Sequence, residues 1–217
     1  MSQLYATITA SFTPRWNDRG SGASRDGGFW HPSPQGDMRP LGSVAVPHYN
    51  DINGYNTARL YGPSSCSGAA SASGPGPVAS PTGYTQIWKD EKSGAAKDGS
   101  FWRPIPPNGY VALGDVAVSG WSPAPSTNDV WCVRVDLIKQ GSFGSNSVWD
   151  DRKSGAKNDV SVWEIRHSTG WGAEGEAEAA EAEVVGDGEV AATYLGPIRG
   201  SQDYNAPDSS FARVPLV

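Results

Sequence analysis

The chain has 217 residues, a length that fits one all-β domain with a core of its own. It contains 27 Gly, 17 Pro and 9 Trp, and only 18% of its residues are charged, which is typical of short strands joined by tight turns. Residues 172–190 carry seven acids, so the rest of the chain is close to +1 when the net charge of −6 is corrected for them (−6 + 7). Neither part of the chain has the strong positive charge that binding to phosphate backbones requires. The composition therefore argues against nucleic acid as a partner.

The amino-terminal segment MSQLYATITASF lacks the basic stretch and apolar core of a secretory signal. No apolar run in the chain is long enough to span a bilayer. We therefore expect the protein in the cytoplasm, or released without a signal peptide. The alternation of apolar and polar residues in YATITASF predicts a β-strand that begins near Tyr5.

A polar loop between two tryptophans follows this strand and occurs three times in the chain. Its copies are WNDRGSGASRDGGFW (16–30), WKDEKSGAAKDGSFW (88–102) and WDDRKSGAKNDVSVW (149–163). All three keep the same residue at two, five, six, seven, ten and fourteen positions after the first tryptophan, without a gap. Agreement at so many fixed positions indicates internal duplication.

The duplication extends beyond the loops and predicts three units, at about 5–62, 83–140 and 141–200. In the first two units a Leu-Gly pair, at Leu41 and Leu113, follows the second tryptophan at the same spacing. These units are longer than the repeats of a typical β-trefoil.

Two segments interrupt the repeats. Residues 63–82 are rich in Gly, Ser, Ala and Pro, and we expect a flexible, linker-like loop there. Residues 173–189 form an acidic insertion in the third unit, where the Pro-rich segment of the other units is missing. We expect this insertion to be a solvated excursion from the domain.

The second unit carries the most distinctive segments, FWRPIPPNGYVALGDVAVSG and VWCVRVDL, beside the Trp-x-Asp and Ser-Gly-Ala motifs. This set resembles the vacuolar protein sorting-associated protein 62 family, and it is similar to a tryptophan-rich segment of bridge-type lipid-transfer proteins. The resemblance covers the second unit well, the first in part, and the third through its loop. It implies little chemistry, although some bacterial members of this group look like components of insecticidal or membrane-active proteins.

Three copies of one β unit predict a single all-β domain over residues 1–217 with pseudo-threefold symmetry, because each unit alone would expose an apolar face. Sheets packed as a three-sided prism, with the loops gathered at the ends, fit this prediction, and a β-trefoil is the alternative. Trp30, Trp102 and Trp163 share one offset, so we expect them in equivalent, mostly buried positions.

The repeated loop has two interpretations. In the first, each aspartate accepts backbone N–H bonds in a turn, and glycine supplies a positive φ angle. In the second, carboxylate and serine oxygens bind sugar hydroxyls or a hard cation such as Ca²⁺, and repetition adds avidity. The candidate ligand-binding residues are Asp18, Asp26, Asp90, Asp98, Asp151, Asp159, Ser21, Ser93 and Ser154. Of these, Asp90 and Asp98 are also candidate metal ligands.

No catalytic residue is predicted. The chain has no nucleophile elbow, zinc-protease motif or phosphate-binding glycine loop. The three histidines, His31, His48 and His167, occupy unrelated sequence contexts and are expected at the surface or in turns.

The sequence therefore predicts a non-catalytic, lectin-like module that binds glycans or a lipid membrane surface. No cofactor is firmly predicted, but the aspartate loops could hold Ca²⁺, and the pattern permits a homo-oligomer. A component of a membrane-active toxin, of pore-forming or insecticidal type, is the first alternative. A glycoside hydrolase that uses paired aspartates is the second, although three like loops are unusual for an enzyme with one site.

Overall fold

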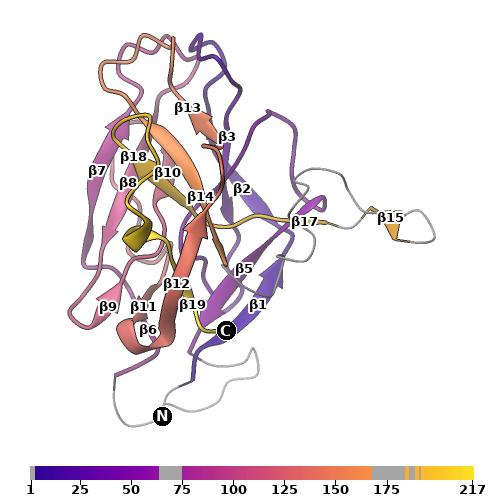
Figure 1. The fold of residues 1–217 in the computed structure, drawn as a ribbon, viewed down its shortest axis with the longest axis vertical. Coiled ribbons are helices and arrows are strands. Elements are labelled where there is room, and N and C mark those ends of the chain that lie inside the picture. The colour runs from indigo at the N-terminus through magenta and orange to yellow at the C-terminus, as the bar shows by residue number, and fades with distance from the viewer. Residues whose placement is uncertain (1–2, 64–74, 168–183, 186–188, 191) are drawn as a thin grey trace.

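The computed structural model describes residues 3–63, 75–167, 184–185, 189–190 and 192–217 (Figure 1). Regular structure in these residues is almost entirely β-strand, which confirms the all-β class. The helices of the described part are two short 3-10 turns, η1 (Val135–Leu137) and η2 (Ser209–Phe211). Within the same part, no helix has the length and apolar character needed to cross a membrane.

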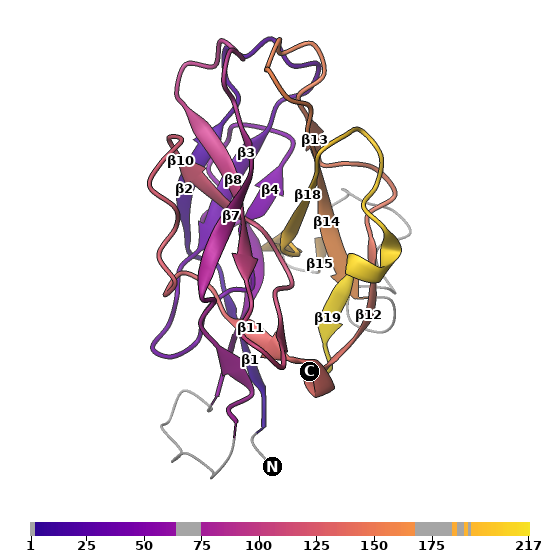
Figure 2. The same ribbon diagram turned by 90° about the vertical axis from the view of Figure 1, so that its left-hand side faces the viewer.

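Each repeat contributes three antiparallel strands, and its loop joins the first strand to the second. In the first repeat these strands are β2 (Phe12–Asn17), β3 (Gly28–Pro32) and β4 (Val44–Val46). In the second they are β7 (Gly83–Lys89), β8 (Gly99–Ile105) and β10 (Val116–Ser119). In the third they are β13 (Trp149–Asp150), β14 (Ser161–His167) and β18 (Ile198–Ser201). This common plan carries the three loops to the same end of the molecule (Figures 1 and 2).

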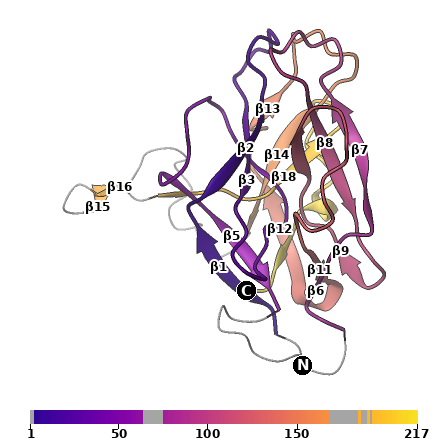
Figure 3. The ribbon, with the colours of Figure 1, turned by 180° about the vertical axis from the view of Figure 1, so that it is seen from behind.

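The remaining strands form smaller sheets or extend the third repeat. β1 (Tyr5–Thr9) pairs with β5 (Asn56–Gly62), to which β17 (Thr193–Tyr194) adds in parallel. β11 (Cys132–Arg134) lies between β6 (Val78–Ala79) and β9 (Tyr110–Val111). β12 (Ile138–Phe143) joins β14 to β19 (Arg213–Pro215), and β15 (Val184–Val185) pairs with β16 (Glu189–Val190). Figure 3 shows these strands from behind.

The structure describes only part of the two interrupting segments. Strand β6 lies inside the stretch 63–82 that we expected to be a linker-like loop, and residues 64–74 of that stretch lie outside the described residues. The β15–β16 pair overlaps the end of the expected acidic insertion, of which residues 173–183 and 186–188 lie outside the described part. The unit boundaries therefore stay a prediction.

The first tryptophans of the three loops meet at one point in the core. Trp16, Trp88 and Trp149 are all buried, and their ring centroids are 5.6 to 5.7 Å apart at tilted or edge-on angles. Phe29 and Phe101 pack against the same group. These five aromatic rings belong to one core cluster to which all three repeats contribute, beside two further hydrophobic clusters in the described residues.

Each of these tryptophans hydrogen-bonds to a neighbouring repeat. The Nε1–H donors and their acceptors are Trp16 to the Lys97 carbonyl (2.7 Å), Trp88 to the Asn158 carbonyl (2.8 Å) and Trp149 to Asp18 Oδ2 (3.0 Å). The bonds run in one direction around the three repeats. A pseudo-threefold arrangement produces this cyclic pattern, whereas the prism-like packing of the sheets stays a prediction.

Glycine makes room for two of the indoles. A methyl carbon added at Gly99 would lie 2.4 Å from Trp16, and one at Gly27 would lie 2.5 Å from Trp149. The third repeat has Val160 at the equivalent position, eleven residues after its first tryptophan. The indoles of Trp16 and Trp149 therefore pack directly on backbone.

A second cyclic contact joins the third strands of the repeats. Ser43 N–H donates to the Asp115 carbonyl (2.9 Å), Asp115 N–H to Ile198 (2.7 Å), and Ile198 N–H back to Ser43 (2.9 Å). The side chain of Asp115 is fully buried and accepts two hydrogen bonds from Arg103, at 3.0 Å each. The three backbone bonds thus tie together the starts of β4, β10 and β18.

The second tryptophans of the loops are less uniform than we expected. Trp163 is buried, but Trp30 and Trp102 are only half-buried. Trp102 and Trp163 each donate to the hydroxyl of a serine two residues earlier, at 2.8 Å. Their role in the core is thus smaller than that of the first tryptophans.

His31 is buried, which contradicts the expectation of a surface or turn histidine. Its Nδ1 lies 3.1 Å from Ser43 Oγ, and its Nε2 lies 3.1 Å from the Asp129 carbonyl. Burial, together with the positive charge of Arg15, lowers the pKa of His31 to about 4. The imidazole therefore stays neutral in the folded protein over most of the pH range.

This histidine should make stability depend on pH. Between pH 6.5 and about 4 the unfolded chain binds a proton at His31 and the folded chain does not. The unfolding free energy should therefore decrease as the pH is lowered through this window. The expected slope is about 1.4 kcal/mol per pH unit for each such histidine. Urea melts across this window should show it, and His31→Gln should remove one histidine's share. His167, whose pKa burial also lowers to about 4, should contribute a slope of the same sign.

The aromatic cluster should dominate stability. Trp88→Ala removes a buried indole that contacts rings from all three repeats, so it should lower the unfolding free energy by about 3 to 5 kcal/mol. Tyr55→Ala is the matched control, because Tyr55 is 75% exposed and should change stability by no more than about 0.5 kcal/mol. Denaturant melts of both variants give the comparison, and equal losses would contradict a shared core.

Candidate functional site: the loop face

The three loops touch one another through their main chains. The hydrogen bonds run from the eighth residue after the first tryptophan of one loop to the third residue of another. They join Ser24 N–H to Arg152 O (2.9 Å), Ala96 N–H to Arg19 O (2.8 Å) and Lys157 N–H to Glu91 O (2.9 Å). We call the surface formed by residues 18–27, 90–99 and 151–160 the loop face (Figure 2). Because the bonds close a cycle, the loop face is one surface rather than three independent turns.

The first aspartate of each loop is buried and closes its own turn. Asp18, Asp90 and Asp151 are 2 to 3% exposed. One carboxylate oxygen of each accepts the backbone N–H nine residues later, at 2.8 to 3.0 Å. This is the turn geometry of the first interpretation, and a ligand-binding role for these three residues stays a prediction.

The Ser-Gly-Ala segment completes the turn. Ser21, Ser93 and Ser154 are buried, and each hydroxyl accepts the N–H of the alanine two residues later, at 3.0 to 3.1 Å. The intervening glycines have φ angles of +77°, +77° and +75°, as the sequence predicts. The serine oxygens are thus engaged within the loops, and their role in binding stays a prediction.

An aromatic donor that the sequence analysis missed completes each loop. Tyr49 donates its hydroxyl to Asp18 (2.8 Å), Trp121 its indole N–H to Asp90 (2.5 Å), and Tyr204 its hydroxyl to Asp159 (3.0 Å). Tyr49 and Trp121 each follow the first tryptophan of their repeat by 33 residues (49 − 16 and 121 − 88). That equal spacing is the signal that could have revealed them.

Two of these aromatics link both aspartates of their loop. Burial raises the pKa of Tyr49, and hydrogen bonds to Asp18 and then Asp26 raise it further. Burial likewise raises the pKa of Tyr204, with hydrogen bonds to Asp159 and Asp151. In the first and third loops, one tyrosine hydroxyl therefore lies close to both aspartates of the loop.

The second aspartates are the carboxylates that remain open to solvent. Asp26, Asp98 and Asp159 are all exposed. Within the described residues, no group of three or more His, Cys, Asp or Glu side chains is arranged to hold a metal ion. The assignment of Asp90 and Asp98 as metal ligands stays a prediction, with Asp90 buried and Asp98 exposed.

Charge is divided across the loop face. Each loop carries equal numbers of acids and bases, two of each in the first and three of each in the others. The first aspartates and Asp150 are buried, whereas the bases reach the surface. The exposed bases are Arg19, Arg25, Lys92, Lys97, Arg152, Lys153 and Lys157. The exposed layer of the loop face thus holds these seven bases and the three second aspartates, an excess of positive charge, and the first aspartates lie beneath it.

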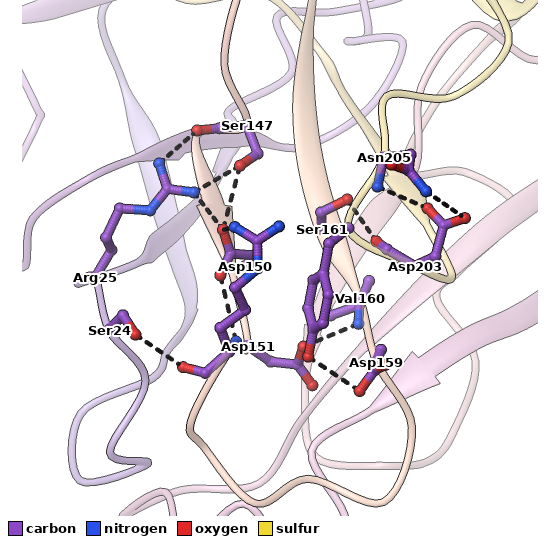
Figure 4. Close-up of polar contacts among 12 residues, drawn as sticks. Ser24, Arg25, Ser147, Asp150, Asp151, Asp159, Val160, Ser161, Asp203 and Asn205 are labelled. Carbon is purple, nitrogen blue, oxygen red and sulfur yellow. Dashed lines mark hydrogen bonds and ion pairs between the residues drawn. The ribbon is translucent and has the colours of Figure 1, made fainter.

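Arginines and a lysine tie the outer layer to the inner one. Arg25 of the first loop pairs with Asp150 of the third and donates to the carbonyl and hydroxyl of Ser147, at 2.9 and 2.6 Å (Figure 4). Arg19, Lys89 and Arg152 lie over the rings of Tyr49, Trp121 and Tyr204, at 4.7, 4.8 and 4.5 Å from the ring centroids. These contacts hold cationic groups at the surface in fixed positions.

Two lysines at the tips adopt a strained backbone. Lys92 and Lys153 have φ angles of 70° and 73°, and they are the non-glycine residues with positive φ in the described chain. The equivalent residue of the first loop is Gly20, with φ of 87°. A left-handed conformation costs a non-glycine residue about 1 to 2 kcal/mol. Stability alone would therefore favour glycine at all three tips.

A groove borders the first loop. It has a volume of about 210 Å³ and lies between strands of the first repeat and the loop of the second. Its lining includes Arg15, Asn17, Trp30, Tyr49, Lys97 and Ser119. Partly exposed aromatic rings beside amide, hydroxyl and cationic groups are the surfaces on which sugar rings stack and bond.

Comparison with known proteins places this architecture in a family. Residues 29–180 match the family described as vacuolar protein sorting-associated protein 62. The chain belongs to this family. The match includes all of the second and third loops, so the sequence resemblance to the family is confirmed.

A solved structure is similar to nearly the whole chain. The chain is similar to GNIP1Aa from Chromobacterium piscinae, with 27% sequence identity and a TM-score of 0.68 over 97% of the chain. It spans about a third of that protein, 35% of its length. No curated protein matches the chain.

The first two loops should respond differently to the loss of one charge. Asp18 accepts donors on both oxygens, including Trp149 Nε1–H, so an asparagine amide there would face a buried donor whichever way it turned. Asp90 accepts from Ser93 on its second oxygen, and that hydroxyl can also accept a bond. Asp18→Asn should lower the unfolding free energy by about 1 to 3 kcal/mol more than Asp90→Asn. Equal denaturant melts for the two variants would contradict this difference.

Proposed function

We propose that this chain is a non-catalytic binding module whose loop face recognises anionic groups at a cell surface, carried by glycans or by membrane lipids. The observation that carries the proposal is the excess of exposed bases on the loop face, seven against three exposed aspartates, above buried carboxylates. Such a surface attracts sulfate, carboxylate or phosphate groups at close range, although the chain as a whole is acidic. Three adjacent loops add avidity to contacts that are weak one at a time.

The strained lysines support this proposal. Lys92 and Lys153 occupy a left-handed conformation that Gly20 adopts without cost in the first loop. Residues held in unfavourable backbone conformations cluster at functional sites, where the side chain serves a purpose other than stability. The ammonium groups of these exposed lysines do not contribute to the core. Contact with an external anion would explain why lysine occupies these positions.

The groove and the exposed aspartates favour a glycan component. Trp30 and Tyr49 offer ring faces to a sugar, and Asn17 and Ser119 offer hydrogen bonds. Asp26, Asp98 and Asp159 would accept hydroxyl donors, directly or through a Ca²⁺ ion that also contacts the glycan. A non-catalytic role is favoured because the three loops are alike and their first aspartates are committed to the turns.

The double variant Lys92→Gly/Lys153→Gly tests the proposal without disturbing the fold, since it copies the residue of the first loop. Each lysine near an anionic surface contributes about 1 kcal/mol, so binding should weaken roughly 30-fold. The unfolding free energy should hold or rise, since relief of about 1 to 2 kcal/mol of backbone strain at each position offsets the unfolded-state entropy of glycine, about 0.4 to 1 kcal/mol each. The measurements are an array of sulfated, sialylated and neutral glycans, sedimentation with phosphatidylserine and phosphatidylcholine vesicles, and a urea melt.

Lys139→Gln with Arg134→Gln removes the same charge from strands away from the loop face and should leave binding unchanged. Repeating each assay with Ca²⁺ and with a chelator isolates any contribution of the ion. Glycan binding without vesicle binding would identify a lectin, and the reverse would identify a lipid-binding module. The proposal fails if neither surface is bound, or if the lysine double variant binds as well as the unaltered protein.

A component of a membrane-active toxin is the second candidate. One observation favours it: the chain corresponds to 35% of GNIP1Aa, so in that protein a unit of this fold accompanies further chain. In such an assembly the loop face would attach the protein to its target surface. Release of dye from the vesicles that are bound in the sedimentation assay would support membrane activity, and binding without release would assign this chain to attachment alone.

A further inference from the structure

One position breaks the agreement between the three sheets. In each repeat the second tryptophan pairs across the sheet with one residue of the third strand: Trp30 with Val44, Trp102 with Val116, and Trp163 with Arg199. Val44 and Val116 are 1% and 0% exposed, and Arg199 is 7% exposed. The third repeat therefore buries a cation where the other two bury an apolar side chain.

The charge of Arg199 is poorly compensated by the protein. Its nearest carboxylate is Asp115, with Arg199 Nη1 3.9 Å from Asp115 Oδ1. Asp115 already accepts two bonds from Arg103 and one from the Gly200 N–H (2.8 Å). Among the described residues, the guanidinium of Arg199 has no hydrogen-bond acceptor within the usual limits, and its nitrogens are not among the fully buried, unpaired atoms. One anion thus faces two arginines, and Arg199 is left with one distant carboxylate.

Arg199 lines a cavity of about 450 Å³, within the size range of pockets for small ligands. The cavity lies between the second and third repeats, in the half of the molecule that holds β9, β12 and β19, away from the loop face (Figure 1). A second arginine, Arg213, also lines it, and the lining contains no acidic residue. The remaining lining residues are Val111, Ala112, Val135, Ile138, Ser210 and Phe211.

The apolar part of this lining is unusually exposed. Val135 and Phe211 are 53% and 51% exposed, although both are large hydrophobic residues. The Phe211 ring lies over the Arg199 guanidinium, with 5.0 Å between the guanidinium carbon and the ring centroid. Since the stacked face is covered by Phe211, the in-plane N–H groups of Arg199 remain available for an anionic partner. The hydroxyl of Ser210 is a further donor.

We propose that this cavity binds a small organic anion, in which a phosphate or carboxylate head is joined to an apolar body. The head would pair with Arg199 and Arg213, and a planar guanidinium suits bidentate contact with either group. The apolar body would cover Val135 and Phe211. The ligand would supply a second negative charge, because the one charge of Asp115 is already paired with Arg103. This site is separate from the loop face and does not depend on the function proposed for it.

Calorimetric titration and thermal melts of the full chain test the site with hexyl phosphate and hexanoate as probes. Inorganic phosphate and hexanol carry only the head or only the body, and each should bind at least tenfold more weakly than the joined molecule. Vesicles containing phosphatidic acid, compared with phosphatidylcholine alone, distinguish an anionic lipid from a soluble anion as the source of the head group.

Two variants make the test specific. Arg199→Val restores the residue of the other two repeats, so the protein should fold, and its affinity for hexyl phosphate should fall at least tenfold. Ala112→Phe fills the cavity while keeping both arginines, and it should also abolish binding. Arg19→Gln removes a base from the loop face and should leave hexyl phosphate binding unchanged.

The proposal is overturned if hexyl phosphate and hexanoate give neither heat nor a thermal shift at millimolar concentration. It is also overturned if Arg199→Val binds hexyl phosphate as tightly as the unaltered protein, or if Arg19→Gln weakens that binding as much as Arg199→Val does. The role of Arg199 would then be limited to its ion pair with the buried Asp115.

Discussion

The indoles of Trp16, Trp88 and Trp149 are buried together, and each N–H group needs a hydrogen-bond acceptor inside the protein. The rest of the domain depends on how these three acceptors are supplied. No repeat supplies an acceptor for its own first tryptophan, so Trp16, Trp88 and Trp149 reach into neighbouring loops. An unpaired indole donor at the centre would cost as much as a lost buried hydrogen bond. This constraint brings the loops to one end of the molecule, and it fixes them as a single surface whose outer layer is free to vary.

Two departures from the threefold pattern lie at the two proposed binding sites. The second and third loops place lysine where the first has Gly20, and the third sheet places Arg199 where the others have valine. A repeat built only for stability would keep glycine at the tips and an apolar residue in the sheet. Local choices that conflict with the fold are expected mainly at functional sites, because elsewhere they only weaken it. The two proposed binding sites rest on residues of this kind.

Sequence alone was sufficient where one residue type recurs at one spacing. It predicted the all-β class, the three loops and the positive φ of the loop glycines, because strand alternation and turn chemistry depend on local pattern. It missed Tyr49 and Trp121, which share a spacing but differ in type, and Tyr204, which follows its first tryptophan at another distance (204 − 149 = 55). It could not predict the cavity at Arg199, because Val111, Ile138 and Phe211 come together only through the packing of two repeats.

The cyclic indole bonds also govern how the chain can reach its fold. They connect residues 81, 70 and 131 positions apart, so each requires the ordering of a long intervening segment before it contributes. A linear repeat array can nucleate on any neighbouring pair and grow. Here the first two repeats lack Trp149 until the third has been synthesised, and their aromatic faces stay incomplete until then. Folding should therefore be slow and cooperative, as for other proteins dominated by non-local contacts, and it should be completed only after the third repeat has been synthesised.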